Sequence, residues 1–422
     1  MNILRGSCKA LQGVLYYPQV FIPYFVTVTL RPHQNRVCDR MASNDKGQVI
    51  VPTGGGKTLC MISDTILCHK YINNGITTIV VAPRILLAEQ LCSEFLEVID
   101  TSHTHIMHVH SGETHHFSTT NPEKIALFAN CARTAGENLI IFTTYNSLDR
   151  IRQSDIEVNV IYFDEAHNSV NRNFFPATEY FSNESDRCYF FTATPKHSLT
   201  VSRPGMNDGS VYGPVLVNVP APELVEGGYI LPPKVVVKQL PMIKNRKVVF
   251  ADDCDNLLET IDDNNISKTL ICARTTQQII NLISQSQFCT ELASRGYSWM
   301  TITSKTGAII DGEKVDREKF FDTLNAWGRD PDKKFVCIHH SILSEGINVN
   351  GLEAVVFMRN MDYIGISQSI GRVIRLGGDQ KTFGLIVCPC YDPVGISTAR
   401  RVQSVVDVVF NQGQPAISEI RR

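Results

Sequence analysis

The chain has 422 residues, of which 43% are hydrophobic and 19% are charged. This balance is typical of a globular protein, and it excludes a disordered, collagen-like, coiled-coil or small disulfide-stabilised chain. The length suffices for two or three domains, each with a buried core. A formal net charge of −2, from 40 basic and 42 acidic residues, excludes a strongly basic protein. A polyanion would therefore have to bind in a local groove.

The cysteines, the apolar runs and the N-terminal segment indicate the cellular compartment. Thirteen cysteines are scattered, and Cys388–Cys390 is the only close pair, which favours reduced thiols in the cytoplasm. No apolar run is long enough to span a membrane, so we expect no membrane partner. Residues 1–30 carry basic but no acidic residues, and we interpret them as a lead-in segment. Their order, and a role in targeting, stay open.

Short runs of β-branched residues alternate with amphipathic segments in the first half of the chain. The runs predict five strands, at Gln48–Val51, Thr77–Val81, Leu139–Thr143, Val158–Phe163 and Cys188–Thr192. The intervening segments predict helices at Lys57–Tyr71 and Leu86–Ile99. Continuous apolar strands separated by helices are typical of parallel sheets with helices on both faces.

A stretch rich in Pro and Gly, Ser202–Tyr229, predicts a boundary or connector. A second alternating set follows, with five predicted strands at Thr269–Ala273, Trp299–Thr303, Phe335–His339, Ala354–Met358 and Gly384–Cys388. Helices are predicted near Thr276–Ser286 and Asp316–Trp327. We therefore expect an α/β protein with two tandem lobes, residues 31–225 and 226–422, each a mostly parallel sheet covered by helices on both faces.

The sharpest local signal is a glycine loop between a predicted strand and a predicted helix. Glycines let the backbone curl so that N–H groups face phosphate oxygens, and the helix N-terminus adds a positive partial charge. Lys57 would contact the β- and γ-phosphates of a nucleotide, and the Thr58 hydroxyl would ligate Mg²⁺. The alternative, a glycine turn that precedes Lys-Thr by chance, does not explain the flanking strand and helix. The residues expected to bind nucleotide here are Thr53, Gly54, Gly55, Gly56, Lys57 and Thr58.

Two acids, Asp164 and Glu165, follow the apolar run Val158–Phe163. Ligands bind at the carboxyl ends of strands in α/β sheets. Asp164 would hold Mg²⁺ through water, and Glu165 would polarise the attacking water as a general base. His167 is expected to couple this site to the second lobe. Two acids after a strand are a weak signal alone, but their place between the glycine loop and Thr192-Ala-Thr194 strengthens it.

The segment from Gln368 to Arg375 places Arg372 and Arg375 three residues apart, on one face of a predicted helix. Two guanidinium groups suit a γ-phosphate whose charge grows in the transition state. Gln368, Arg372 and Arg375 are therefore candidate catalytic residues. They lie in the second lobe, so they would act only when the lobes close around the nucleotide. An ordinary basic surface helix is the alternative.

These three motifs, in this order, resemble superfamily 2 helicases, and more closely their DEAH-spelled, restriction-subunit-like DNA branch, which includes phage helicases. The resemblance covers about residues 30–390 and implies RecA-like lobes. The glycine loop matches the helicase variant, in which Val51 stands where the strict P-loop has Gly. The resemblance implies that Gln34 reads the adenine and that Gly346 and Asn348 contact the nucleotide. The family usually has Asp at the position of Asn348, so this chain lacks a charge beside the ribose.

In that family, nucleic acid crosses both lobes, and its phosphates meet hydroxyls, main-chain N–H groups and a few arginines. Such contacts would let a nearly neutral chain bind a polyanion. By resemblance, the candidate nucleic-acid-binding residues are Arg84, Thr144, Arg274 and Ser341. For each of them the alternative is a helix cap, a turn residue or a surface charge.

The resemblance implies an ATP- and Mg²⁺-dependent DNA helicase or translocase that acts on single-stranded, forked or branched DNA. We expect a monomer in the cytoplasm, or in the host cytoplasm if the protein is viral, with replication or recombination proteins left open as partners. No large strand-separating domain is apparent, so remodelling or short-duplex unwinding is expected rather than processive unwinding. The alternatives are an RNA helicase, the motor subunit of a restriction-type complex, and a nucleotide-gated scaffold without hydrolysis.

Two further signals are discounted. Six of the twelve histidines fall within His103–His116, but the apolar residues between them suit a strand with one wetter face better than a zinc site. The segment Lys234–Lys247 holds five basic residues and no acid. It is interpreted either as part of the path of the bound strand or as a solvated entrance to the second lobe.

Overall fold

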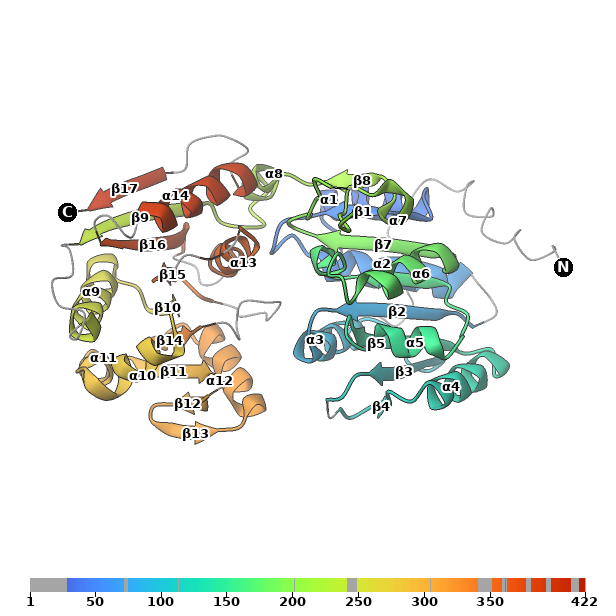
Figure 1. Ribbon diagram of the computed structural model, residues 1–422, viewed down its shortest axis with the longest axis horizontal. Helices are drawn as coiled ribbons and strands as arrows, with labels where there is room; N and C mark the ends of the chain where they lie inside the picture. Colours follow the sequence, from blue (N-terminus) through green and yellow to red (C-terminus); the bar gives the residue numbers. More distant parts are fainter. Residues whose placement is uncertain are drawn as a thin grey trace. The chain divides into compact units, whose positions relative to one another are not determined.

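The computed structural model describes residues 29–71, 75–112, 114–200, 202–240, 249–303, 305–340, 351–358, 361, 363–376, 381–391, 396–410 and 417–421. The chain divides into two compact units. The first comprises the chain up to Val51 and residues 56–219, and the second comprises residues 52–55 and the chain from Pro220 onward. Each unit is an α/β body built on one sheet (Figure 1).

The first unit contains an eight-stranded sheet in the order β4-β3-β5-β2-β6-β7-β1-β8, with every adjacent pair parallel. Its strands are β1 (Lys46–Ile50), β2 (Thr77–Ala82), β3 (Thr104–Val109), β4 (Phe117–Ser118), β5 (Asn138–Thr144), β6 (Val160–Phe163), β7 (Arg187–Thr192) and β8 (Val215–Asn218). The five predicted strands are confirmed within two residues at either end. The histidine-rich segment supplies β3, as its alternating pattern predicts.

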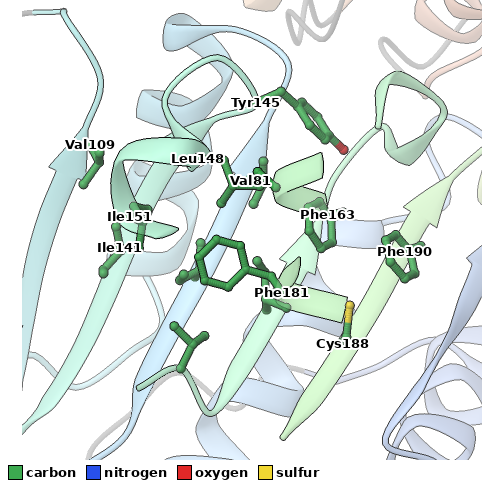
Figure 2. Packing of buried hydrophobic residues seen from close by; sticks show 14 of the residues in the cluster. Val81, Val109, Ile141, Tyr145, Leu148, Ile151, Phe163, Phe181, Cys188 and Phe190 are labelled. Atoms are coloured by element: carbon green, nitrogen blue, oxygen red, sulfur yellow. The ribbon is translucent and has the colours of Figure 1, made fainter. Parts of the chain in front are cut away.

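Helices of the first unit cover both faces of this sheet. They are α1 (Pro32–Ala42), α2 (Lys57–Tyr71), α3 (Ile85–Leu96), α4 (Pro122–Thr134), α5 (Leu148–Gln153), α6 (Phe175–Glu184) and α7 (Gly209–Tyr212). On one face, Phe163 and Phe190 from the strands pack in a cluster that includes Phe181 of α6 and Ile151 of α5 (Figure 2). On the other face, Phe95 of α3 packs edge-on against Phe142 of β5, the neighbour of the cluster residue Ile141.

The second unit contains a nine-stranded sheet in the order β13-β12-β11-β14-β10-β15-β16-β9-β17. Its strands are β9 (Pro233–Leu240), β10 (Lys268–Cys272), β11 (Ser298–Thr303), β12 (Gly307–Ile310), β13 (Glu313–Val315), β14 (Phe335–His339), β15 (Ala354–Phe357), β16 (Gly384–Tyr391) and β17 (Ile417–Arg421). The hairpin of β12 and β13 adds antiparallel strands to one edge, and the other pairs are parallel. The mostly parallel sheet predicted for this lobe is confirmed.

The helices of the second unit are α8 (Ala221–Glu226), α9 (Val249–Asn264), α10 (Thr276–Gln285), α11 (Phe288–Ser294), α12 (Arg317–Arg329), α13 (Tyr363–Val373) and α14 (Ile396–Val405). Helices α9, α10 and α11 bury their apolar residues in one cluster with strand residues such as Ile271, Val336 and Val356. Helices α13 and α14 contact β15 and β16, and their buried residues, such as Ile370 and Val402, lie outside that cluster.

Two interpretations of the sequence need correction. The stretch interpreted as a boundary or connector does contain the division between the two units, at Pro220, but it also contains β8, which extends the first sheet beside β1. The basic segment beginning at Lys234 supplies β9, which lies inside the second sheet between β16 and β17. Lys238 of β9 is 9% exposed and its ammonium lies 2.7 Å from the Glu259 carboxylate, so this lysine is part of the folded unit rather than of a solvated entrance. Residues 241–247 of that segment lie outside the described residues.

Within the described ranges, no helix has both the length and the apolar character needed to cross a membrane. The cysteines of the described chain are free thiols, and most of them are buried.

A partly buried histidine on α2, His69, predicts acid sensitivity of the first unit. Burial lowers the pKa of His69 to about 4 from 6.5, and its Nε2 has no hydrogen-bond partner in the described part of the chain. Between these two values the unfolded chain binds a proton that the folded chain does not, so stability should fall as the pH drops from 7 to 4. The loss from this group is about 2 kcal/mol at pH 5. Urea unfolding at pH 7 and pH 5 should show a smaller pH effect for His69→Leu, and equal pH effects in both proteins would contradict this assignment.

Candidate nucleotide and nucleic-acid sites

The glycine loop joins β1 to α2, and its backbone requires glycine at two positions. Gly54 and Gly56 have φ values of 87° and 78°, which residues with a Cβ atom rarely adopt. The Gly55 N–H donates to the Pro52 carbonyl at 3.0 Å and closes a tight turn. Helix α2 begins at Lys57, so its N-terminal N–H groups lie at the loop. This is the geometry that binds phosphate at a helix N-terminus.

Gln34 of α1 reaches the same loop. Its Nε2 donates to the Gly56 carbonyl at 3.1 Å, and its Oε1 accepts from the Arg31 N–H at 2.8 Å. A Cβ on residue 56 would lie 2.3 Å from Gln34 Nε2, so a side chain there would displace the Gln34 amide. The structure therefore brings Gln34 to the nucleotide loop, where a role in reading the adenine stays a prediction.

The acidic pair lies at the carboxyl end of β6. Lys57 Nζ is 3.5 Å from Glu165 Oε1, and both side chains are nearly buried. Glu165 adopts a left-handed conformation, with φ 46° and ψ 52°. Such a conformation costs on the order of 1–3 kcal/mol and tends to occur at functional sites. Tyr145, whose role the sequence did not reveal, donates its hydroxyl hydrogen to the Asp164 carbonyl at 2.9 Å and supports this turn.

Asp164 has the environment of a cation ligand. Its Oδ1 is buried and has no hydrogen-bond partner among the described residues. Burial, and then the charge of Glu165, raise the pKa of Asp164 to about 7, while Lys57 acts in the opposite direction. A divalent cation would favour the ionised carboxylate, and its water ligands could donate to the unpartnered oxygen. The residues present therefore fit Mg²⁺, with Asp164 and the hydroxyl of Thr58, the second residue of α2, as its candidate ligands.

His167 joins the acidic turn to the end of β7. Its Nδ1 lies 3.0 Å from Thr192 Oγ1 and 3.5 Å from Glu165 Oε2, and its side chain is buried. Thr192 Oγ1 also accepts from the Thr194 N–H at 3.1 Å. These contacts lie within the first unit, and the predicted coupling of His167 to the second lobe stays a prediction.

Two candidate nucleic-acid residues share this edge of the sheet. Arg84 follows β2 and is exposed, and Thr144 ends the neighbouring strand β5, where it pairs with Ala82. The Thr144 side chain is 4% exposed and its hydroxyl donates to Ser147 Oγ at 3.3 Å. Arg84 is therefore exposed to solvent and the Thr144 hydroxyl is engaged inside the unit, and nucleic-acid binding by either residue stays a prediction. The strand order sets these two residues along the same edge as the acidic pair after β6 and the glycine loop after β1.

The candidate catalytic residues of the second unit lie around α13. Gln368 and Arg372 are buried in this helix, at 6% and 2% exposure. The spacing predicted that Arg372 and Arg375 share one helix face. That prediction is wrong, because the helix ends at Val373 and Arg375 lies two residues beyond it. The Lys381 ammonium donates to the Arg375 carbonyl at 3.1 Å and fixes the backbone there.

The remaining predictions divide into three groups. Ser341, Gly346 and Asn348 lie outside the described residues. Arg274 is described, and it is held by Asp253 and Gln278, two residues that sequence reasoning missed. In the described ranges, no group of three His, Cys, Asp or Glu side chains has the geometry of a metal site. Two of the clustered histidines contact each other instead, with His108 Nδ1 2.9 Å from His110 Nε2.

The glycine loop and the acidic turn lie at one edge of the first sheet, and the two mostly parallel sheets define an α/β protein with tandem RecA-like units. Residues 27–197 match the family described as "Type III restriction enzyme, res subunit". This match covers less than half of the chain, and over that segment, which holds the glycine loop and the acidic pair, the chain is similar to the family. No curated protein sequence matches the chain.

Among solved structures, the chain is similar to the ATP-dependent Type ISP restriction-modification enzyme LlaBIII bound to DNA, with 19% identity and a TM-score of 0.74. It is also similar to a nuclease-deletion mutant of the Type ISP enzyme LlaGI in complex with a DNA substrate mimic, with 20% identity and a TM-score of 0.66. Each match covers 93% of this chain, but the chain spans only about a third of those proteins, 31% and 30%.

A Dbp5 variant from S. cerevisiae, bound to RNA and ADP BeF3, also matches, with 15% identity and a TM-score of 0.59. This match covers 91% of this chain and 89% of that one. At these identities the three likenesses establish the fold alone.

Proposed function

We propose that this chain is an ATP-dependent DNA translocase or helicase that remodels forks, branches or short duplexes. The observation that carries the proposal is the group formed by the glycine loop, Lys57, Asp164 and Glu165 at one edge of the first sheet. Arg84, which is exposed, lies along the same edge. Nucleotide chemistry and nucleic-acid contact would thus share one rigid sheet.

Each candidate side chain then has a proposed role. Lys57 and the N-terminus of α2 bind the β- and γ-phosphates of ATP, and Glu165 accepts the proton of the attacking water. Asp164 and Thr58 would hold Mg²⁺, which would supply positive charge to the phosphate oxygens. Arg372 and Arg375 supply further positive charge as the transition state forms. Asn348 and Gly346 keep their proposed contact with the nucleotide, and Ser341 keeps its proposed contact with nucleic acid.

Nucleic-acid preference tests the proposal directly. ATP turnover should rise more with single-stranded or forked DNA than with RNA of the same length. DNA affinity should fall steeply with salt, and about five to seven phosphate contacts give a log–log slope of roughly −4 to −6 on duplex DNA. A coupled ATPase assay compares single-stranded DNA, duplex DNA, forked DNA and RNA side by side. Anisotropy titrations at several salt concentrations measure the slope. Stimulation by RNA that exceeds stimulation by every DNA form would instead support an RNA helicase.

A second function, the motor subunit of a restriction-type complex, is favoured by the family match and by the larger size of the Type ISP enzymes. Such a motor would travel on duplex DNA without separating its strands. Displacement of a triplex-forming oligonucleotide from duplex DNA, measured beside the unwinding of a fork, distinguishes the two. Triplex displacement without fork unwinding would favour the restriction-type motor.

A further inference from the structure

A buried carboxylate in the second unit grips one of the candidate nucleic-acid arginines. Asp253 of α9 has a side chain that is 1% exposed. Arg274 Nη2 donates to its Oδ1 at 3.1 Å and to its Oδ2 at 3.0 Å. Gln278 Nε2 donates to Oδ2 at 2.6 Å, and Gln278 Oε1 accepts from the Arg274 backbone N–H at 2.7 Å. Both the backbone and the side chain of Arg274 are therefore fixed by two neighbouring helices.

The position of this group indicates more than stabilisation. Arg274 follows β10, one of the central strands of the sheet, and it lies at the carboxyl edge where α/β proteins bind ligands. Its side chain is 36% exposed, while the carboxylate behind it is buried. A charge buried in this way is costly unless it is paired. The neighbouring acids of α9, Asp252 and Asp255, are exposed, so of these three acids only Asp253 is turned into the unit.

We propose that Asp253, with Gln278, is a positioning residue that orients the Arg274 guanidinium toward a phosphate of the bound nucleic acid. This inference rests on the proposed function, because it needs a nucleic-acid strand at this edge. Arginine loses side-chain entropy when it is fixed on a ligand, and a preset orientation reduces that loss on binding. Asp253 acts through Arg274 and does not itself contact the strand.

For Asp253→Asn, the proposal predicts a change in nucleic-acid affinity opposite to the change that simple electrostatics predicts. Asp253→Asn removes a negative charge, so long-range attraction alone would strengthen the binding of a polyanion. If Asp253 positions Arg274, the same substitution should weaken binding. Asp255→Asn is the matched control, since it makes the same change of charge on the same helix at an exposed position. It should leave affinity unchanged or slightly improved.

The experiment measures binding of a fluorescein-labelled single-stranded DNA oligonucleotide by anisotropy at several salt concentrations. We expect Asp253→Asn to weaken binding about 3- to 10-fold and to reduce the salt slope by about 0.7, the contribution of one phosphate on a single strand. Arg274→Met should do the same, and Asp253→Asn should have no further effect in the Arg274→Met background. That non-additivity marks one shared contact.

The outcomes separate the two proposals. If the wild-type chain binds neither DNA nor RNA, the proposed function fails and this inference fails with it. If the wild-type chain binds DNA but Asp253→Asn behaves like Asp255→Asn, only the positioning role is overturned. If circular dichroism shows that Asp253→Asn does not fold, Gln278→Met decides. That variant keeps the charges and removes the amide that holds the pair, so it should weaken binding, and unchanged binding would overturn the role.

Discussion

Replacing Lys57 with alanine should abolish ATP turnover. Its ammonium lies at the start of α2, beside the glycine loop and 3.5 Å from the Glu165 carboxylate. It could therefore contact both a nucleotide phosphate and this carboxylate. Without it, the β- and γ-phosphates lose their cation. Lys57 is 11% exposed, so the substitution also leaves the Glu165 carboxylate buried without that partner. A melting curve must therefore accompany the assay, and turnover within a few-fold of wild type in a folded variant would overturn the phosphate-loop assignment.

Glu165→Gln separates binding from chemistry. The amide keeps the shape of the side chain and removes the base, so ATP should still bind while hydrolysis slows by roughly 10²–10⁴-fold. Single-turnover hydrolysis and nucleotide affinity, measured on the same preparation, give the two quantities. Glu184→Gln, an exposed change on α6, serves as the matched control and should hydrolyse ATP at the wild-type rate. A Glu165→Gln protein that loses ATP affinity but keeps its turnover number would contradict the role of the base.

The fold was predictable where a strong local signal agreed with burial. Helix α2 was bounded correctly because the glycine loop fixes its start, and β14 because all five of its residues are buried. Strand β8 was missed because it is a short edge strand, largely exposed, within a stretch of Pro and Gly. Strand β9 was missed because its lysines suggested solvent, although Lys238 pairs with acids of α9 that no sequence pattern connects to it.

The candidate nucleotide site was largely predictable because its chemistry requires particular residues in a short segment. Lys57, Asp164 and Glu165 were named from the sequence, and the structure places them at one edge of the first sheet, with Lys57 3.5 Å from Glu165. Asp253 was not predictable, because the rest of helix α9 and the whole of strand β10 separate it from Arg274 in the sequence. Only tertiary packing brings the two side chains together. The end of α13 before Arg375 was also beyond a spacing argument, which assumes that the helix continues.

A buried ion pair behind the glycine loop predicts the largest effect on stability. Arg187 of β7 donates to Asp64 of α2 at 2.9 Å, and both side chains are almost fully buried. Arg187 also donates to the Met41 carbonyl at the end of α1, and the Tyr162 hydroxyl of β6 donates to Asp64 at 2.6 Å. These bonds connect α1 and α2 to the two strands that lead to the acidic turn and to Thr192.

Removing one partner of this pair should destabilise the first unit by about 3–5 kcal/mol, because the other charge stays buried without compensation. Arg187→Met and Asp64→Leu test the two sides, and urea unfolding followed by circular dichroism measures the loss. Arg152→Met removes an arginine from an exposed ion pair with Asp149, so it should cost less than about 1 kcal/mol. Equal losses for Arg187→Met and Arg152→Met would show that the buried pair contributes no more than a surface pair.

The double variant Asp64→Leu with Arg187→Met decides what the pair is for. Replacing both charges by apolar groups should recover most of the stability, since no buried charge is then left unpaired. If the network only stabilises the unit, ATP turnover should recover with it. If it also sets the position of α2 against β6, the folded double variant should keep a raised KM for ATP, because Lys57 begins the helix that Asp64 anchors. Full recovery of both KM and turnover would restrict the network to stability.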